Sequence, residues 1–355
     1  MKKTILFLML ATLLVACSAP NDIYYLHGYF RNTESKTAYM IKSGQVIDST
    51  SIDSTFHFVF KGLKEKTTPQ LVYISDAPST RGTKNSWNVV WEPGMISMFP
   101  EKESDDFSVT GTISNNLLTE MQKKERELEQ KYDELNDQKE EQDKLVDEWY
   151  SYLGKNAKKH TDNLFGLICL REISYEQEPA VTRKMLDAFK KELHETDIWK
   201  QLDEHNVKAL ATAPGKTYIE FSQTDLNGNV ISSKDVMATP GVKYVLIDFW
   251  ASWCGPCMRE LPYLKATYSK YFEKGFQIIG VSLDRSRDAW LKAIEDSQMN
   301  WIQLSDVKAW DNEVAQLYGI NSIPANFLVE ASTGKIIATS LRGEDLEKKI
   351  AELLK

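Results

Sequence analysis

The sequence predicts a multi-domain protein: a small antiparallel β domain, a central all-α helical region, and a C-terminal α/β domain. The chain has 355 residues, which is more than one compact domain usually holds. β-type patterns of period two fill residues 22–112, and a segment rich in Glu, Lys and Gln opens residues 115–208. Strand and helix patterns then alternate over residues 213–355, as they do in α/β folds.

The composition limits the classes of partner. Apolar residues make up 42% of the chain and charged residues 26%, which is ordinary for a soluble globular protein. The formal net charge is −8, and no cluster of Lys and Arg interleaved with aromatic residues offsets it. We therefore expect no nucleic-acid partner.

The N-terminus carries an export signal. Residues 1–17 read MKKTILFLMLATLLVAC, in which two lysines precede an apolar segment too short to span a bilayer comfortably. The closing LVAC resembles a bacterial lipobox, which implies a lipoprotein signal peptide over residues 1–16 and lipid on Cys17. The expected location is the cell envelope, lipid-anchored to a membrane with the domains in the periplasm. Ser18 carries no acidic retention signal, which favours the outer membrane. A plain signal peptide that contains Cys17 is the alternative.

The first predicted domain consists of short β-type runs, such as PQLVYISD and DFSVTGT, separated by turn signals. In TFHFVFKG, Phe56, Phe58 and Phe60 alternate with other residues, as on a half-buried strand. We expect a small antiparallel β domain in which His27 and His57 are ordinary strand residues rather than ligands.

The helical region begins with SNNLLTEMQKKERELEQKYDELNDQKEEQDKLVDEWYSYL, which contains no Pro or Gly. Met121, Leu128 and Leu135 lie seven residues apart, but polar residues interrupt the heptad rows. We expect one long amphipathic helix that packs on its neighbours. A dimerising coiled coil, and with it a homodimer through this region, is the alternative.

Two further helices are expected before residue 208. Thr161-Asp162 should cap the helix NLFGLICLREI, and Pro179 falls in the first turn of EPAVTRKMLDAFKKELHE. Cys169 lies in the apolar first helix, so we expect a buried core thiol rather than a redox residue.

The α/β domain follows a linker marked by APG at residues 213–215. DLNGN predicts a hairpin turn, and KYVLIDFW is a continuous apolar run typical of a central strand covered on both faces. A helix is expected from Pro256 to about Glu273. Further strands are expected at FQIIGVSLD, WIQLSD, NFLVE and KIIATS, and helices at SRDAWLKAIEDS, NEVAQLYG and EDLEKKIAELL.

The segment DFWASWCGPCMRELP, residues 248–262, holds Cys254 and Cys257 two residues apart. Structural zinc would need a second pair of Cys or His ligands, which the sequence does not offer, so we expect no metal. A peroxiredoxin would place Thr where Ala251 stands, and a cysteine protease would need a His within residues 213–355, which hold none. A structural disulfide stays open as an alternative, although so small a loop restricts the unfolded chain little.

Redox chemistry fits the pattern directly. The pair ends a predicted strand and begins a predicted helix, where unsatisfied backbone N–H groups and the helix dipole stabilise a thiolate. A thiolate attacks disulfides, so Cys254 is the expected nucleophile, and Cys257, one helical turn later, resolves the mixed disulfide. The prediction is a thiol-disulfide oxidoreductase that needs no cofactor.

Residues 213–355 resemble the thioredoxin superfamily. The resemblance rests on the complete Trp-Cys-Gly-Pro-Cys in VLIDFWASWCGPC, on the Pro five residues after the second Cys, and on SIPANFLV. It implies a thioredoxin fold in which Ile323 and Pro324 form a cis peptide that faces the cysteines, where a substrate strand can pair. Trp253, Gly255 and Pro256 complete the implied substrate-binding set.

The resemblance also assigns two acidic residues. Asp248 matches the superfamily's buried acid, a proton acceptor for Cys257, and a lone Asp in an apolar strand is costly without such a role. Within the superfamily the chain looks like the exported, membrane-anchored TlpA/ResA group, whose Glu three residues after the second Cys corresponds to Glu260 and tunes the cysteines. The β-rich first domain resembles a domain of unknown function that precedes thioredoxin modules in exported lipoproteins. Asp248 and the Gly-Pro dipeptide depart from many TlpA/ResA proteins, which weakens the transfer of a cytochrome-specific substrate.

The Gly-Pro dipeptide is the one that reductive thioredoxins carry, so a reducing pair is expected. In an oxidising compartment such a pair needs a membrane electron donor of the DsbD or CcdA type, and its substrates would be disulfides in exported proteins or apocytochromes. Two alternatives remain: a net disulfide oxidase or isomerase, and a non-catalytic scaffold lipoprotein that uses the fold for recognition.

Overall fold

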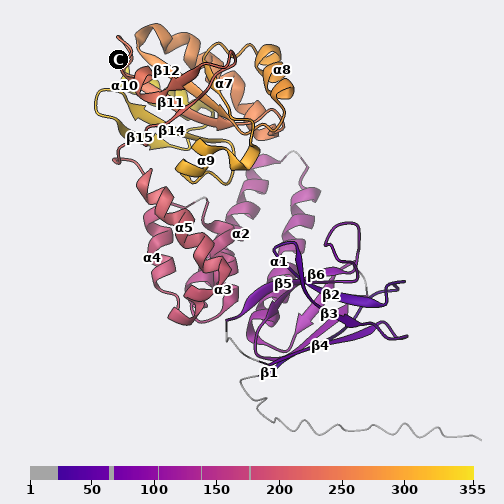
Figure 1. Cartoon of the computed structure of the whole chain (residues 1–355). Helices are drawn as coiled ribbons and strands as arrows, with labels where there is room; N and C mark the ends of the chain where they lie inside the picture. The colour runs from indigo at the N-terminus through magenta and orange to yellow at the C-terminus, as the bar shows by residue number, and fades with distance from the viewer. Residues whose placement is uncertain (1–22, 64–67, 103, 137, 176) are drawn as a thin grey trace, which may run out of the picture. The chain divides into compact units, whose positions relative to one another are not determined.

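The computed structural model describes residues 23–63, 68–102, 104–136, 138–175 and 177–355. It confirms the predicted sequence of folds: β sheets, then helices, then an α/β domain (Figure 1). The chain forms two compact units, one reaching to residue 173 with 188–200, the other made of 174–187 with 201–355. The predicted signal peptide and the lipidation site Cys17 lie outside the described residues.

The N-terminal strands form two four-stranded sheets that share one core. The first has the order β4-β1-β7-β8, and the second has the order β3-β2-β5-β6. The strands are β1 (Ile23–Tyr29), β2 (Thr37–Lys42), β3 (Gln45–Ser51), β4 (His57–Leu63), β5 (Gln70–Ser75), β6 (Ser86–Trp91), β7 (Gly94–Pro100) and β8 (Phe107–Thr110). Leu26 and Phe58 from one sheet and Met40 and Val72 from the other are buried together, as in a β-sandwich. All pairs in the two sheets are antiparallel except β1 with β7, whose direction no hairpin fixes because the two strands are far apart in sequence.

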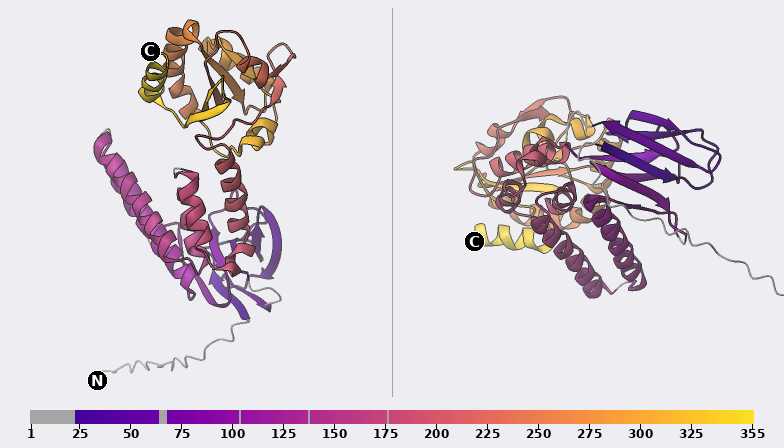
Figure 2. Two further views of the ribbon diagram at one scale, coloured as in Figure 1. Left: turned by 90° about the vertical axis from the view of Figure 1, so that its left-hand side faces the viewer. Right: turned by 90° about the horizontal axis from the view of Figure 1, so that it is seen from below.

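The predicted single long helix is wrong, because two helices stand in its place. Helix α1 (Ile113–Glu134) and helix α2 (Lys139–Lys159) lie side by side in the right-hand view of Figure 2, and Lys124 Nζ pairs with Glu148 Oε1 at 2.6 Å. Asn136 between them has φ 46°, a left-handed conformation that Asn tolerates better than most residues. Helix α1 is tied to the sheets by side-chain amide and hydroxyl bonds to the backbone, from Asn115 to Val90 and from Thr119 to Val109.

Three helices follow: α3 (Leu164–Ile173), α4 (Pro179–Asp187) and α5 (Asp197–Ala211), with a short 3-10 helix, η1 (Lys191–Glu195), before α5. Asn163, not Thr161-Asp162, caps α3, because its Oδ1 accepts a hydrogen bond from Gly166 N at 3.4 Å. Helix α4 begins at Pro179, in the first turn of the predicted helix. It ends at Asp187, so the prediction of a single helix up to Glu195 is wrong, and the 3-10 helix η1 follows separately. Cys169 is a free, fully buried thiol, and burial raises its pKa to about 12. Within the described part of the chain, no helix is long and apolar enough to span a bilayer.

The C-terminal domain is built on a five-stranded sheet of order β13-β12-β11-β14-β15, in which β11 is central and buried on both faces. The predicted hairpin turn joins β9 (Ser222–Thr224) and β10 (Val230–Ser232). The other elements are α6 (Ser233–Met237), β11 (Tyr244–Trp250), α7 (Gly255–Tyr271), η2 (Phe272–Lys274), β12 (Phe276–Ser282), α8 (Arg287–Ser297), β13 (Ile302–Leu304), η3 (Ala309–Asp311), α9 (Glu313–Tyr318), β14 (Ala325–Glu330), β15 (Lys335–Thr339) and α10 (Gly343–Leu353). Each predicted strand and helix of this domain is present.

Candidate active site

The two cysteines lie where β11 gives way to α7, as the sequence predicts. They form a disulfide with a Cα–Cα distance of 5.2 Å, and both side chains are buried. Cys254 is the N-cap of α7, and its Sγ accepts a hydrogen bond from Cys257 N at 3.1 Å. After reduction, the same N–H and the positive end of the helix would stabilise a Cys254 thiolate.

A buried carboxylate holds the loop that precedes the cysteines. Asp284 accepts hydrogen bonds from Ser252 N at 3.0 Å, from Ser252 Oγ at 2.5 Å and from Ser282 Oγ at 2.8 Å. Sequence reasoning missed Asp284. One feature of the sequence could have indicated Asp284: it is a polar residue just after the end of β12. The carboxyl ends of the neighbouring parallel strands β11 and β12 meet at one edge of the sheet, which is where the cysteine loop begins.

The cis peptide implied by the resemblance joins Ile323 to Pro324, just before β14. Ile323 O lies 3.7 Å from Cys254 Sγ, so the loop borders the reacting sulfur. The guanidinium of Arg342 donates a hydrogen bond to Pro324 O. Arg342 is a second positioning residue that the sequence did not reveal, because it approaches from the start of α10.

Asp248 lies on β11 directly opposite Gly280 and Asn326 of the two neighbouring strands. Burial raises the pKa of its carboxyl to about 7, the negative charge of Glu260 adds to the increase, and Arg342 opposes it. A cavity of about 10 Å³, close to the size of one water, is bordered by both Asp248 and Cys257. The carboxyl can therefore exchange a proton near neutral pH beside the second cysteine.

Glu260 contributes to this site in two ways, through a hydrogen bond and through its charge. Its Oε2 accepts a hydrogen bond from Gly343 N at 2.7 Å, so it satisfies the N-terminus of α10 from α7. It also borders the cavity beside Asp248, whose pKa it raises. The structure thus connects Glu260 to the site through Asp248, whereas the resemblance connected it to the cysteines.

Two exposed aromatic rings lie near the buried disulfide. Trp253 is 53% exposed, and its ring lies 5.9 Å from that of Trp310, which is 38% exposed. Gly255 and Pro256 are exposed beside them at the start of α7. The predicted substrate-binding residues therefore surround the disulfide, and Trp310 from η3 extends that surface. No group of three or more His, Cys, Asp or Glu among the described residues is placed to hold a metal ion.

This geometry defines a class: a thiol-disulfide oxidoreductase with a thioredoxin-like fold. Residues 214–339 match the model of the AhpC/TSA family. The chain is 33% identical over 141 residues to the thiol-disulfide oxidoreductase ResA of Bacillus thuringiensis subsp. konkukian. The matched region covers 40% of this chain and 76% of that protein. It is 28% identical over 145 residues to ResA of Geobacillus kaustophilus, at 40% and 79% coverage.

Among solved structures, the thioredoxin domain of a thiol-disulfide oxidoreductase from Bacteroides vulgatus is 38% identical, covering 40% of this chain and 99% of that chain with a TM-score of 0.37. Through its C-terminal 40% the chain belongs to the ResA-like thiol-disulfide oxidoreductases. The matched region begins at residue 214, so the β sheets and helices α1–α5 are not assigned by it.

Proposed function

We propose that the protein reduces disulfide bonds of exported proteins, with Cys254 as nucleophile and Cys257 as resolving residue. The observation that supports this most is the placement of Cys254 Sγ at the N-terminus of α7, 3.1 Å from a backbone N–H and beside the cis-proline loop.

The first step forms a mixed disulfide. The Cys254 thiolate attacks one sulfur of the substrate disulfide, an S–S bond forms between protein and substrate, and the other substrate sulfur leaves as a thiolate. The exposed Trp253 and Trp310 rings would pack on the substrate. An extended substrate segment would lie along the loop that carries Pro324.

The second step releases the substrate. The Cys257 thiol gives its proton to the Asp248 carboxylate, across the cavity that both residues border, and the new thiolate attacks Cys254 Sγ. The intramolecular disulfide forms and the second substrate sulfur leaves as a thiolate. Two electrons pass to the substrate, and the protein must then be reduced again.

The proposed setting follows from residues 1–18. A lipid on Cys17 would hold the protein in the cell envelope, with the domains in the periplasm and the outer membrane favoured. Because that compartment is oxidising, reduction of the Cys254–Cys257 disulfide would require a membrane donor of the DsbD or CcdA type. Disulfide-containing exported proteins would be the substrates.

Two measurements test the proposal. Purified protein should reduce insulin with dithiothreitol as donor, and background rates would favour the scaffold alternative. Thiol trapping in cells should find a substantial fraction of Cys254 and Cys257 reduced. A pair that is fully oxidised at steady state would favour the oxidase and overturn the reductase proposal.

A further inference from the structure

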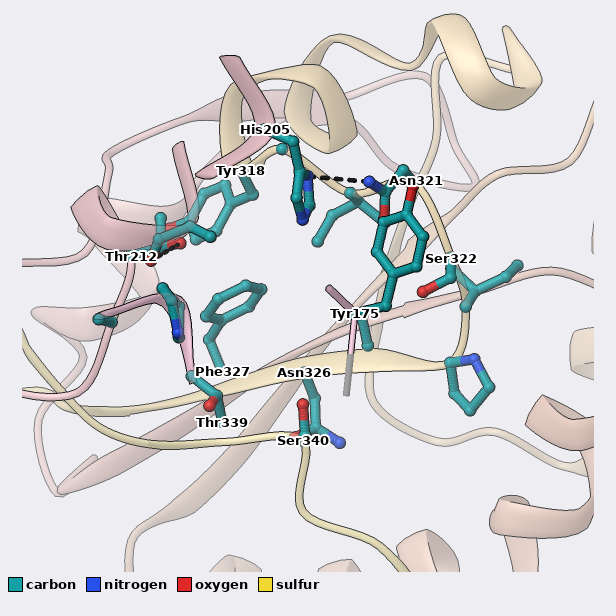
Figure 3. Close-up of a pocket in the computed structure, with 18 of the residues that line it drawn as sticks. Tyr175, His205, Thr212, Tyr318, Asn321, Ser322, Asn326, Phe327, Thr339 and Ser340 are labelled. Carbon is teal, nitrogen blue, oxygen red and sulfur yellow. Dashed lines mark hydrogen bonds between the residues drawn. The ribbon is translucent and has the colours of Figure 1, made fainter. Parts of the chain in front are cut away.

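A pocket of about 630 Å³ lies beside the cis-proline loop, and only one of its walls belongs to the thioredoxin-like fold. That wall includes Asn326 and Phe327 of β14 and the loop before them. The other wall comes from the segment that precedes α4 and from α5, which supply Tyr175 and His205. Figure 3 shows these side chains arranged around an open space, with Tyr175 and His205 across from Asn326 and Phe327.

The second wall is attached to the loop that carries the cis peptide. Asn321 Nδ2 donates a hydrogen bond to His205 Nδ1 at 2.8 Å, and the ring of Tyr175 stands edge-on to His205 at 5.3 Å (Figure 3). Burial lowers the pKa of His205, which favours the neutral ring that can accept this bond. The hydrogen bond of Asn321, three residues before Pro324, therefore connects the two walls of the pocket.

Two amide oxygens in the second wall have no hydrogen-bond partner among the described residues. Asn206 is 1% exposed, and its Nδ2 donates to Pro179 O at 2.8 Å. Its Oδ1, and the buried Oε1 of Gln177, have no hydrogen-bond partner within the described chain. Both residues line the pocket. A buried carbonyl oxygen without a donor is unfavourable, so the pair points to a ligand that supplies N–H groups.

The charges of the pocket limit what that ligand is. Arg259, Glu260 and Arg342 are the charged residues that line it, and they belong to α7 and to the start of α10. The residues contributed by the second wall are uncharged near neutral pH. A cationic ligand would find no carboxylate there, and an anionic one would meet carbonyl oxygens. An uncharged primary amide, which offers two N–H donors, fits.

We propose that this pocket binds the side chain of an Asn or Gln that lies near the reactive cysteine of the protein substrate. The acceptors come from residues that precede the family match at 214, so they would give this chain a selectivity that the thioredoxin-like fold alone does not supply. The inference rests on the proposed reductase function, since it names a preferred substrate of the same site.

The test measures single-turnover reduction by the full-length, prereduced protein. The probes are heptapeptides with one central cysteine joined by a disulfide to glutathione, and each of the other positions is varied in turn among Gln, Leu, Lys and Glu. At one position, Gln should react about tenfold faster than Leu, the factor that one well-formed hydrogen bond to a desolvated group contributes. Equal rates for all four residues at every position would overturn the inference without any variant.

Variants then locate the effect. Gln177→Leu and Asn206→Leu should each reduce the Gln-to-Leu rate ratio towards one, and Gln177→Glu should shift the preference to Lys. Val207→Ala, at a 55% exposed position of the same helix α5, is the matched control and should keep the ratio. A preference for Gln that survives both Leu variants, with the fold confirmed by circular dichroism, would place the recognition elsewhere and contradict the proposal.

The small disulfide 5,5′-dithiobis(2-nitrobenzoate) distinguishes failure of the reductase function from failure of the amide pocket. If the wild-type protein reduces neither this probe nor any peptide, the reductase function fails. If it reduces the probe and all peptides at one rate, the function stands and the amide pocket fails.

Discussion

Burial of the Asp248 carboxyl in the central strand gives the folded protein a pH dependence that can be measured. As pH rises, the carboxyl ionises near 3.8 in the unfolded chain but near 7 in the folded one, so the free energy of unfolding falls across this interval. A rise from 3.8 to about 7 corresponds to about 4 kcal/mol. Asp248→Asn stays neutral and should be more stable than the wild type at pH 8 by up to this amount, with a much smaller difference at pH 4.

Urea unfolding of the oxidised proteins at both pH values checks this prediction. Asp296→Asn is the matched control, because that carboxylate is 59% exposed on α8 and an exposed ion pair contributes little. Equal stabilities of the wild type and Asp248→Asn at pH 8 would show that the carboxyl is ionised without cost in the folded state.

The different roles proposed for Cys254 and Cys257 predict that their substitutions have opposite effects on the amount of mixed disulfide. Cys257→Ala should accumulate mixed disulfides with substrate proteins through Cys254, because the resolving thiol is absent. Cys254→Ala should form few or none, since Cys257 lies one turn inside α7 and not at the helix N-terminus that stabilises a thiolate. Non-reducing gels of cell extracts measure both, and a Cys257→Ala protein without mixed disulfides would contradict the assignment of the nucleophile.

At the scale of elements, Glu260 connects α7 to α10 and also acts on Asp248, and two substitutions separate these effects. Glu260→Gln keeps an oxygen for Gly343 N and removes the charge, so it should lower the pKa of Asp248 while stability stays within about 0.5 kcal/mol. Glu260→Ala removes both and should cost about 1 kcal/mol as well, as the loss of a helix cap does.

The readouts for this pair are urea unfolding and the pH profile of single-turnover insulin reduction. The midpoint that reports Asp248 should move to lower pH in both variants. A midpoint that moves in the Ala variant alone would assign the effect to the displaced helix rather than to the charge.

Local sequence patterns predicted most helices and strands and the reactive cysteine pair. Predictions failed where contacts between segments distant in sequence determine the structure. The sheet of the C-terminal domain follows from apolar runs, and Cys254 at the start of α7 from a strand-to-helix pattern. No Pro or Gly marks the break between α1 and α2 at Asn136. The two helices are held together by contacts between residues distant in sequence, such as the ion pair of Lys124 with Glu148. Trp310 reaches the site from η3 and Arg342 from the N-terminus of α10, so only the folded chain shows their approach.

At the scale of the whole molecule, the proposed lipidation of Cys17 would determine the compartment in which the protein reduces disulfides. We expect a lipid on Cys17 to hold the mature protein at the membrane. Cys17→Ser in a bacterial host should move the protein from the membrane fraction to the soluble fraction, and its rate of insulin reduction should stay unchanged because the substitution is remote in sequence from Cys254 and Cys257. Fractionation with immunodetection measures the shift, and metabolic labelling with palmitate should mark the wild type but not the variant. A Cys17→Ser protein that stays in the membrane fraction would show that something other than this lipid holds it there.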